Sequence, residues 1–168
     1  MFALVGYATR HGSTREIAER IATTLVEHGG TVELRTLDQV GDVCPYDAVV
    51  IGSAVYSGRW LTEATAFVRR QLPALAQRPV WMFSAGRLSG QSGLLRWVTR
   101  PDARELAEFR ARLHPRDHRH FGGAVLRERL SPLQRTAFRA AGGRYGDFRD
   151  WDEIDAWAES ISHKLEIA

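Results

Sequence analysis

The chain has 168 residues and a mass of 18.9 kDa, a size that suits one domain with its own hydrophobic core. Its hydrophobic fraction of 44% and charged fraction of 26% are typical of a soluble globular protein, and no apolar run approaches the roughly 18 residues that a membrane-spanning helix needs. A net charge of +3 does not indicate a nucleic-acid partner. Cys44 is the only cysteine and no signal peptide is evident, so we expect a cytoplasmic protein without an internal disulfide.

Short apolar segments alternate with segments of helical periodicity along the chain. The strands are expected at residues 2–8, 31–37, 46–52, 79–85 and 120–126. The helices are expected around residues 17–25, 61–72, 102–113 and 150–165, with Asp102 as the cap of the third and with capping-box spacing from Asp150 to Glu153 in the last. A further partly helical segment is expected from Ser131-Pro132, with Pro132 at the first helical position. This alternation predicts βαβ units, which build a parallel sheet with right-handed crossovers. Polar and apolar residues alternate in 31–37, which indicates a strand near the sheet edge, whereas 46–52 is apolar in the manner of a central strand.

The segment between the first strand and the first helix predicts an anion-binding loop. Thr9, Ser13 and Thr14 supply hydroxyl donors, and Gly12 lets the backbone approach a ligand. The first turn of a helix also leaves N–H groups unpaired and carries partial positive charge. The spacing lacks the Gly-Lys-Ser/Thr of a P-loop and the three glycines of a dinucleotide fingerprint, so a monophosphate suits it better than a triphosphate. The alternative is a plain helix cap by Ser13 or Gly12, with Glu16 completing a capping box.

The same stretch resembles the FMN phosphate loop of flavodoxin-like proteins. It reads Thr-Arg-His-Gly-Ser-Thr-Arg-Glu-Ile-Ala over residues 9–18 and is especially similar to the menaquinone-dependent protoporphyrinogen dehydrogenases, which have T-R-D-G-x-T-R-E-I-A there. His11 stands where that family has Asp. The resemblance implies an α/β fold, a flavodoxin-like three-layer α/β/α sandwich with a five-stranded parallel sheet of order 2-1-3-4-5. It also implies FMN as the cofactor, with the phosphate bound by Thr9, Arg10, His11, Gly12, Ser13 and Thr14.

The segments after the third and fourth strands match the two loops that flank the flavin ring in flavodoxin-like proteins. Their residues are Ser53, Ala54, Val55, Tyr56, Ser57 and Gly58 in the first loop, and Ser84, Ala85, Gly86 and Arg87 in the second. Tyr56 is the candidate stacking residue, while Trp60 is either a ring contact or, more simply, the first core residue of the next helix. No aromatic residue lies between Ser84 and Gln91, which leaves one flavin face open for exchange with a substrate, or covered by the segment 94–97.

Further segments resemble the same family, and others depart from it. Phe121-Gly-Gly-Ala is similar to F-A-G-A-L, and Gly142-Gly143 with Asp150-Trp151 is similar to G-G-E-T-D-T and T-D-W. The stretch from Gly142 to Asp150 is shorter here, and the basic segment after the third loop differs in sequence. The roles of residues 87–118 and 127–150, and with them the substrate and the electron acceptor, are therefore not carried over with the cofactor.

A basic cluster with three histidines lies before the predicted fifth strand. It comprises Arg112, His114, Arg116, His118, Arg119 and His120. The spacing of His118 and His120 could serve a metal, but no carboxylate or cysteine cluster accompanies it, so we expect a solvated polar loop. The same cluster could meet an anionic lipid or a substrate carboxylate. Cys44 is expected to be inert, because nothing nearby in sequence would make it a thiolate.

These features predict a single flavodoxin-like domain over residues 1–168 that binds FMN and acts as an oxidoreductase similar to quinone-dependent protoporphyrinogen dehydrogenase. Two alternatives stand: a flavin or deazaflavin electron-transfer protein without its own substrate, and a member that has lost its cofactor. Flavodoxin shuttles are strongly acidic, so the positive net charge makes a shuttle the weaker alternative. The expected partners are a small-molecule substrate or a quinone, with peripheral membrane contact and a homodimer left open, and with no metal or nucleic acid.

Overall fold

A parallel sheet of five strands forms the centre of the computed structural model, which describes residues 1–168 except 57, 88–103, 126–130, 141–144 and 167–168. The strand order is β2-β1-β3-β5-β6, and the short β4 adds as an antiparallel partner of β3. The strands are β1 (Phe2–Ala8), β2 (Thr31–Thr36), β3 (Ala48–Tyr56), β4 (Arg59–Trp60), β5 (Val80–Arg87) and β6 (Asp117–Gly122). The expected order of five parallel strands is confirmed, with one additional short strand.

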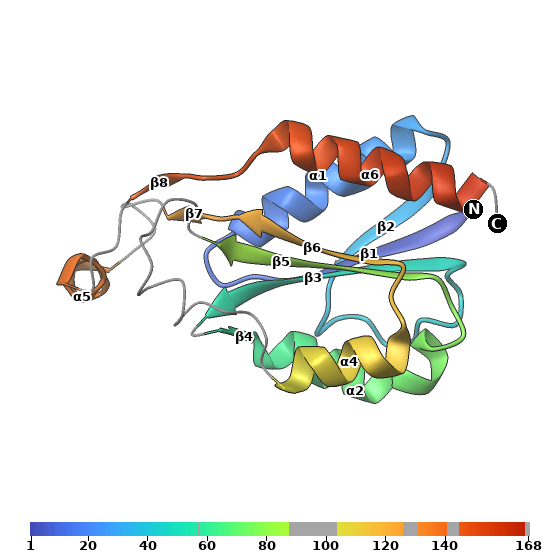
Figure 1. Cartoon of the computed structure of the whole chain (residues 1–168), viewed down its shortest axis with the longest axis horizontal. Coiled ribbons are helices and arrows are strands. Elements are labelled where there is room, and N and C mark those ends of the chain that lie inside the picture. Colours follow the sequence, from blue (N-terminus) through green and yellow to red (C-terminus); the bar gives the residue numbers. More distant parts are fainter. Residues whose placement is uncertain (57, 88–103, 126–130, 141–144, 167–168) are drawn as a thin grey trace.

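Helices cover both faces of the sheet, which gives the three expected layers (Figure 1). The helices are α1 (Ser13–Glu27) and α6 (Trp151–Glu166) on one face, α2 (Thr62–Leu75) and α4 (Arg104–Leu113) on the other, and α5 (Pro132–Ala140) apart from both. α5 lies beyond the carboxyl ends of β3, β5 and β6 (Figure 1). None of the helices in the described residues is long and apolar enough to cross a bilayer.

Each face of the sheet has its own hydrophobic core, because each covering helix buries one apolar stripe. Beneath α1 and α6 the core includes Ile17, Ile21, Leu25, Ile154, Trp157 and Ile161. Beneath α2 and α4 it includes Phe67, Val68, Leu72, Leu106 and Phe109. Arg20 of α1 also pairs with Asp155 of α6 at 2.5 Å, which fixes the two helices side by side. The periodic residues of the sequence therefore face the sheet as predicted.

β3 and β5 run past the points at which the sequence predicts loops. β3 continues to Tyr56 and turns back into β4, and β5 continues to Arg87 with a bulge next to Gly86, whose φ is +134°. The parallel pairing of β3 with β5 extends into both segments and satisfies their backbone groups. Residues 53–56, 86 and 87, which were expected in loops, therefore lie in strands.

The fifth parallel strand also differs from the expected one at 120–126. β6 begins three residues earlier, at Asp117, and ends at Gly122. The chain then forms β7 (Ala124–Val125), which leaves the sheet and pairs antiparallel with β8 (Gly146–Asp147); we call this pair the β7–β8 ribbon. Gly122 permits this exit, because a Cβ there would lie 1.8 Å from the carbonyl oxygen of Phe148. The Phe148 N–H donates to the carbonyl of Gly123 at 3.1 Å and holds the two segments together.

His118 and His120 lie within β6, so the expectation of a solvated polar loop is wrong. Both residues are half-buried, and their ring centroids are 4.5 Å apart. An edge strand with a partly exposed face carries polar residues, which is why this segment has a loop-like composition. Within the described ranges, no group of three His, Cys, Asp or Glu side chains is arranged to hold a metal.

The helix ends confirm two expected features and overturn a third. The Asp150 carboxylate accepts a hydrogen bond from the Glu153 N–H at 3.1 Å and caps α6, and Pro132 takes the first position of α5. Gly12, whose φ is 86°, is the N-cap of α1, as one form of the alternative expected, but no side chain caps this helix, so the capping box with Glu16 is wrong. The expected cap Asp102 lies outside the described residues.

Candidate functional site

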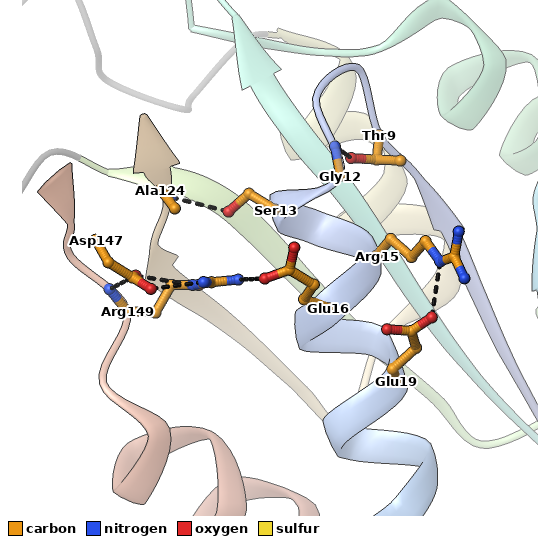
Figure 2. A network of polar contacts seen from close by, with 9 residues as sticks. All are labelled: Thr9, Gly12, Ser13, Arg15, Glu16, Glu19, Ala124, Asp147 and Arg149. Carbon is orange, nitrogen blue, oxygen red and sulfur yellow. Dashed lines mark hydrogen bonds and ion pairs between the residues drawn. The ribbon is translucent and has the colours of Figure 1, made fainter. Parts of the chain in front are cut away.

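The candidate phosphate loop joins β1 to α1 at the carboxyl end of the sheet, the edge at which open α/β sheets bind ligands (Figure 2). The Thr9 hydroxyl accepts a hydrogen bond from the backbone N–H of Gly12 at 3.0 Å and closes the turn. Gly12 adopts a left-handed conformation with a φ of 86°, which residues other than glycine rarely adopt. The loop therefore presents the first turn of α1 to the space beyond the sheet.

Several donors in this first turn remain available to an anion. Within the described part of the chain, the backbone N–H groups of Ser13 and Thr14 have no acceptor, and the hydroxyl of Thr14 makes no hydrogen bond. The Ser13 hydroxyl accepts from the N–H of Ala124 at 2.9 Å, which leaves its own proton for a ligand. These donors stand at the positive end of the α1 dipole, so the arrangement favours an anion.

Tyr56 brings the second predicted segment against the same loop. The Arg10 guanidinium carbon lies 5.2 Å from the Tyr56 ring centroid, and the His11 ring meets the Tyr56 ring edge-on at 6.2 Å. Tyr56 is 39% exposed, so part of its ring is open to a ligand. Burial raises the pKa of the Tyr56 phenol, although Arg10 acts in the opposite direction, so the phenol is neutral near pH 7.

The other described residues of the second predicted segment, 53–58, belong to β3 and to its turn into β4. Ser53 and Ala54 are buried in β3, and the Ser53 hydroxyl accepts from the Leu61 N–H at 3.0 Å while donating to the Ala54 carbonyl at 2.9 Å. Val55 is half-buried, and Gly58 has a φ of 74° in the turn. Ser57 lies outside the described residues. The Ser53 hydroxyl is therefore already used in hydrogen bonds to the backbone of Ala54 and Leu61.

The third predicted segment is also largely internal. Ser84 is buried, and its hydroxyl accepts from the Trp60 indole N–H at 2.8 Å and lies 3.0 Å from Nε2 of His118. Trp60 is 5% exposed, so its interpretation as a core residue is confirmed. Ala85 is buried too, and Arg87 pairs through its backbone with β6.

Close backbone packing joins the end of β5 to the phosphate loop. A Cβ on Gly123 would lie 3.1 Å from the Cα of Gly86 and 3.9 Å from Oγ of Ser13. A Cβ on Gly86 would in turn lie 3.1 Å from the carbonyl oxygen of Val55. Two of the predicted site residues, Ser13 and Gly86, thus lie around Gly123, a residue that the sequence alone did not single out for the site, and Val55 packs against Gly86 in turn.

Arg149 forms a second tie to the phosphate loop, and Figure 2 shows it between Glu16 and Asp147. Its side chain is 6% exposed and donates to Glu16 at 2.5 Å and to Asp147 at 2.5 and 2.8 Å. The guanidinium carbon also lies 4.5 Å from the Trp151 ring centroid. The hydrogen bonds to Asp147 and Glu16 raise the pKa of Arg149 against the opposing effect of burial. Arg149 therefore neutralises an acidic side chain in the first turn of α1.

Comparison with known proteins places this geometry in a family. The model of the flavodoxin domain family, described as "Flavodoxin domain", matches residues 4–144. The chain belongs to this family. The expected resemblance to flavodoxin-like proteins is therefore confirmed, and it covers the phosphate-loop candidate together with the strands that surround it.

Individual relatives are distant. The chain is 24% identical over 174 residues to "Protoporphyrinogen IX dehydrogenase [quinone]" of Escherichia coli strain K12, covering 97% of this chain and 96% of that protein. A flavodoxin from the domain Archaea superimposes with a TM-score of 0.65 at 16% identity, covering 99% of both chains. Oxidised Flavodoxin 2 from Bacillus cereus superimposes with a TM-score of 0.64 at 20% identity, covering 98% of this chain and 99% of that one. These superpositions establish the fold.

Proposed function

We propose that this chain binds FMN noncovalently and acts as an oxidoreductase similar to quinone-dependent protoporphyrinogen dehydrogenase. The main support for FMN is a set of hydrogen-bond donors at Ser13 and Thr14. Within the described residues, their backbone N–H groups have no acceptor. A phosphate dianion fits such a set, because backbone N–H groups and hydroxyls at a helix start bind it without a basic side chain. Membership of the flavodoxin domain family supports a flavin as the carrier of that phosphate.

In this proposal the residues divide between the phosphate and the ring. Ser13 and Thr14 donate to the phosphate, Thr9 shapes the turn, and Arg10 and His11 border it. Tyr56 provides an aromatic face beside the loop, and an aromatic face packs well against a flavin. Bound flavin would supply the hydride or electron exchange, while the protein orients it and limits its contact with water.

The remaining predicted residues would contribute through the backbone. The side chains of Ser53, Ala54, Ser84 and Ala85 are buried within the sheet, so we expect Val55, Gly58, Gly86 and Arg87 to border the ring by their main chain. Such edges can hydrogen-bond the polar rim of a flavin without charged side chains. This assignment keeps all three predicted segments at one end of the sheet.

The dehydrogenase activity is supported by the E. coli relative, whose length the chain matches almost completely. The positive net charge also differs from the acidic surface that suits an electron shuttle. The test is anaerobic oxidation of protoporphyrinogen IX with a quinone acceptor, compared with free FMN at equal concentration. Turnover that stops when FMN is removed supports the proposal. Turnover no faster than the free-FMN blank contradicts the substrate and leaves the cofactor untouched.

A second candidate is an electron-transfer protein that binds a flavin or deazaflavin and has no substrate of its own. The superposition on flavodoxins along nearly the whole chain favours this alternative. The absorption spectrum and mass of the compound released by heat distinguish FMN from a deazaflavin. A bound flavin together with absent porphyrinogen turnover would favour the carrier.

We also propose that residues 1–168 form one cytoplasmic domain. The contact between the first and last helices supports a single unit, because Arg20 and Asp155 pair and the two helices share a core. A cytoplasmic site suits the single exposed thiol of Cys44, which the chain cannot pair internally.

A further inference from the structure

α5 and Tyr145, the residue before β8, line an open cavity that the flavin proposal does not use. The cavity has a volume of about 400 Å³ and is lined by Pro132, Arg135, Thr136, Arg139 and Tyr145. Two of these five residues are arginines, and none of them is acidic. A concave surface with two guanidinium groups and an apolar wall has the composition of a site for an organic anion.

The local structure explains why both arginines face the same space. Arg135 and Arg139 are four residues apart on α5, so they lie one above the other on one face of the helix. The Tyr145 hydroxyl donates to the Arg135 carbonyl at 3.2 Å, which places Tyr145 against α5. The Thr136 hydroxyl donates to the Pro132 carbonyl one turn back at 3.1 Å, so its proton is used within the helix.

The cavity lies at the end of the molecule where the phosphate loop lies. α5 is found beyond the carboxyl ends of the central strands (Figure 1). In sequence it stands between β7 and β8, and the β7–β8 ribbon is tied to the phosphate loop by Ser13 with Ala124 and by Glu16 with Arg149. The cavity therefore lies at the same end of the sheet as the loop at which we propose that the flavin binds.

We propose that this cavity binds a carboxylate group carried by a hydrophobic or aromatic substrate. The proposal rests on the proposed function, because it gives a place to the molecule that exchanges electrons with the flavin. Arg135 and Arg139 line the cavity, and a planar guanidinium can donate paired hydrogen bonds in the geometry of a carboxylate. The pyrrolidine of Pro132 and the ring of Tyr145 provide the apolar wall for the body of the ligand.

Binding of pyrenebutyrate to the purified full-length protein tests this site without any redox step. We expect the acid to bind and its methyl ester, which lacks the charge, to bind about tenfold more weakly or not at all. Arg135→Gln/Arg139→Gln should weaken the acid by about tenfold and leave the ester unchanged. Arg135→Lys/Arg139→Lys keeps both charges but loses the paired hydrogen bonds, so its affinity should fall between the two.

The control is Arg112→Gln/Arg116→Gln, which removes the same charge from exposed positions at and after the end of α4. Equal binding of acid and ester, an unchanged affinity in Arg135→Gln/Arg139→Gln, or an equal loss in the control would each overturn the proposal. Pyrenebutyrate binding needs no electron transfer, so it can fail while FMN is retained. Conversely, a protein purified without flavin would contradict the proposed function and leave this binding result intact.

Discussion

Arg149 reaches Glu16 across 133 positions of sequence, with Nη1 of the guanidinium 2.5 Å from the Glu16 carboxylate. This contact sets a negative charge and its neutralising partner directly beside the loop proposed to hold a phosphate. An unneutralised carboxylate in the first turn of α1 would repel a phosphate dianion. Arg149 therefore acts as a positioning and charge-balancing residue for the loop.

The change Arg149→Met should weaken FMN by roughly fivefold to tenfold, about 1 kcal/mol, because Glu16 then loses its counterion. Riboflavin has no phosphate, so its affinity should change less. The measurement is flavin fluorescence titration with both ligands. The double variant Glu16→Gln/Arg149→Met should recover most of the lost FMN affinity, and a double variant as weak as Arg149→Met would contradict the charge argument.

A side chain at position 122 should disturb the start of the β7–β8 ribbon by steric overlap. In Gly122→Ala, the new Cβ would meet the Phe148 carbonyl oxygen, and backbone there must shift. We expect the free energy of unfolding to fall by about 1–3 kcal/mol. The Phe148 amide, which donates to Gly123, should also exchange its hydrogen faster. Urea unfolding and hydrogen exchange measure the two effects.

Gly41→Ala is the matched control, since a Cβ at Gly41 has no heavy atom within 4 Å. Its unfolding free energy should stay close to that of the unchanged protein. Equal losses in Gly41→Ala and Gly122→Ala would show that the close approach to Phe148 is not the cause.

Ionisation of Tyr46 should lower the stability of the fold at alkaline pH. Burial and the hydrogen bond that it donates to Glu33 raise the pKa of Tyr46 to about 12. An unfolded tyrosine has a pKa of about 10, so the folded state holds this proton more tightly. The contribution is fully present below pH 10 and is lost as the pH rises toward 12.

Urea unfolding at pH 8 and at pH 11 checks this prediction against Tyr46→Phe. The difference in unfolding free energy between the two pH values should be smaller in Tyr46→Phe, which cannot titrate. An identical pH dependence in both proteins would rule out Tyr46 as the source.

Loss of the Tyr56 ring should weaken flavin binding whether or not the flavin carries a phosphate. Tyr56→Ala removes the partly exposed aromatic face beside Arg10 and His11. FMN and riboflavin should both bind about tenfold more weakly, because stacking on an aromatic side chain contributes about 0.5–1.5 kcal/mol beyond buried area. Tyr56→Phe, which keeps the ring, should bind both like the unchanged protein. Full affinity in Tyr56→Ala would place the ring elsewhere.

Local patterns predicted the strand order and the phosphate-loop candidate because both depend on neighbouring residues. The alternation of apolar strands with helical segments specifies a parallel sheet, and Gly12 with Ser13 marks the start of α1 by itself. The first three residues of β6, 117–119, were not predicted to be in a strand, because His118 and Arg119 give this edge strand the composition of a loop.

Contacts between distant segments could not be predicted in this way. Nothing near Arg149 in sequence indicates that its partner is Glu16, and no local pattern shows that Gly122 must admit the backbone of Phe148. The hydroxyls of Ser53 and Ser84 looked available for a ligand, yet the tertiary structure uses them for Leu61 and Trp60. Such pairings follow from packing across the sheet rather than from propensity.

Loss of the hydroxyl donors of the phosphate loop should weaken the binding of FMN but not that of riboflavin, which has no phosphate. Thr14→Ala leaves the bond between Ser13 and Ala124 in place and should weaken FMN by about tenfold, since a hydrogen bond to a charged group contributes about 1.5–3 kcal/mol. Ser13→Ala/Thr14→Ala should nearly abolish FMN retention. Thr23→Ala, on the exposed side of α1, is the control and should bind FMN normally.

The decisive measurement is a fluorescence titration of Ser13→Ala/Thr14→Ala with FMN and with riboflavin, beside the unchanged protein. We expect the variant to lose FMN affinity by a hundredfold or more and to bind riboflavin about as well as the unchanged protein, because two charged hydrogen bonds of roughly 1.5–3 kcal/mol each are removed. Equal losses for both ligands, or no loss for either, would show that Ser13 and Thr14 do not hold a phosphate.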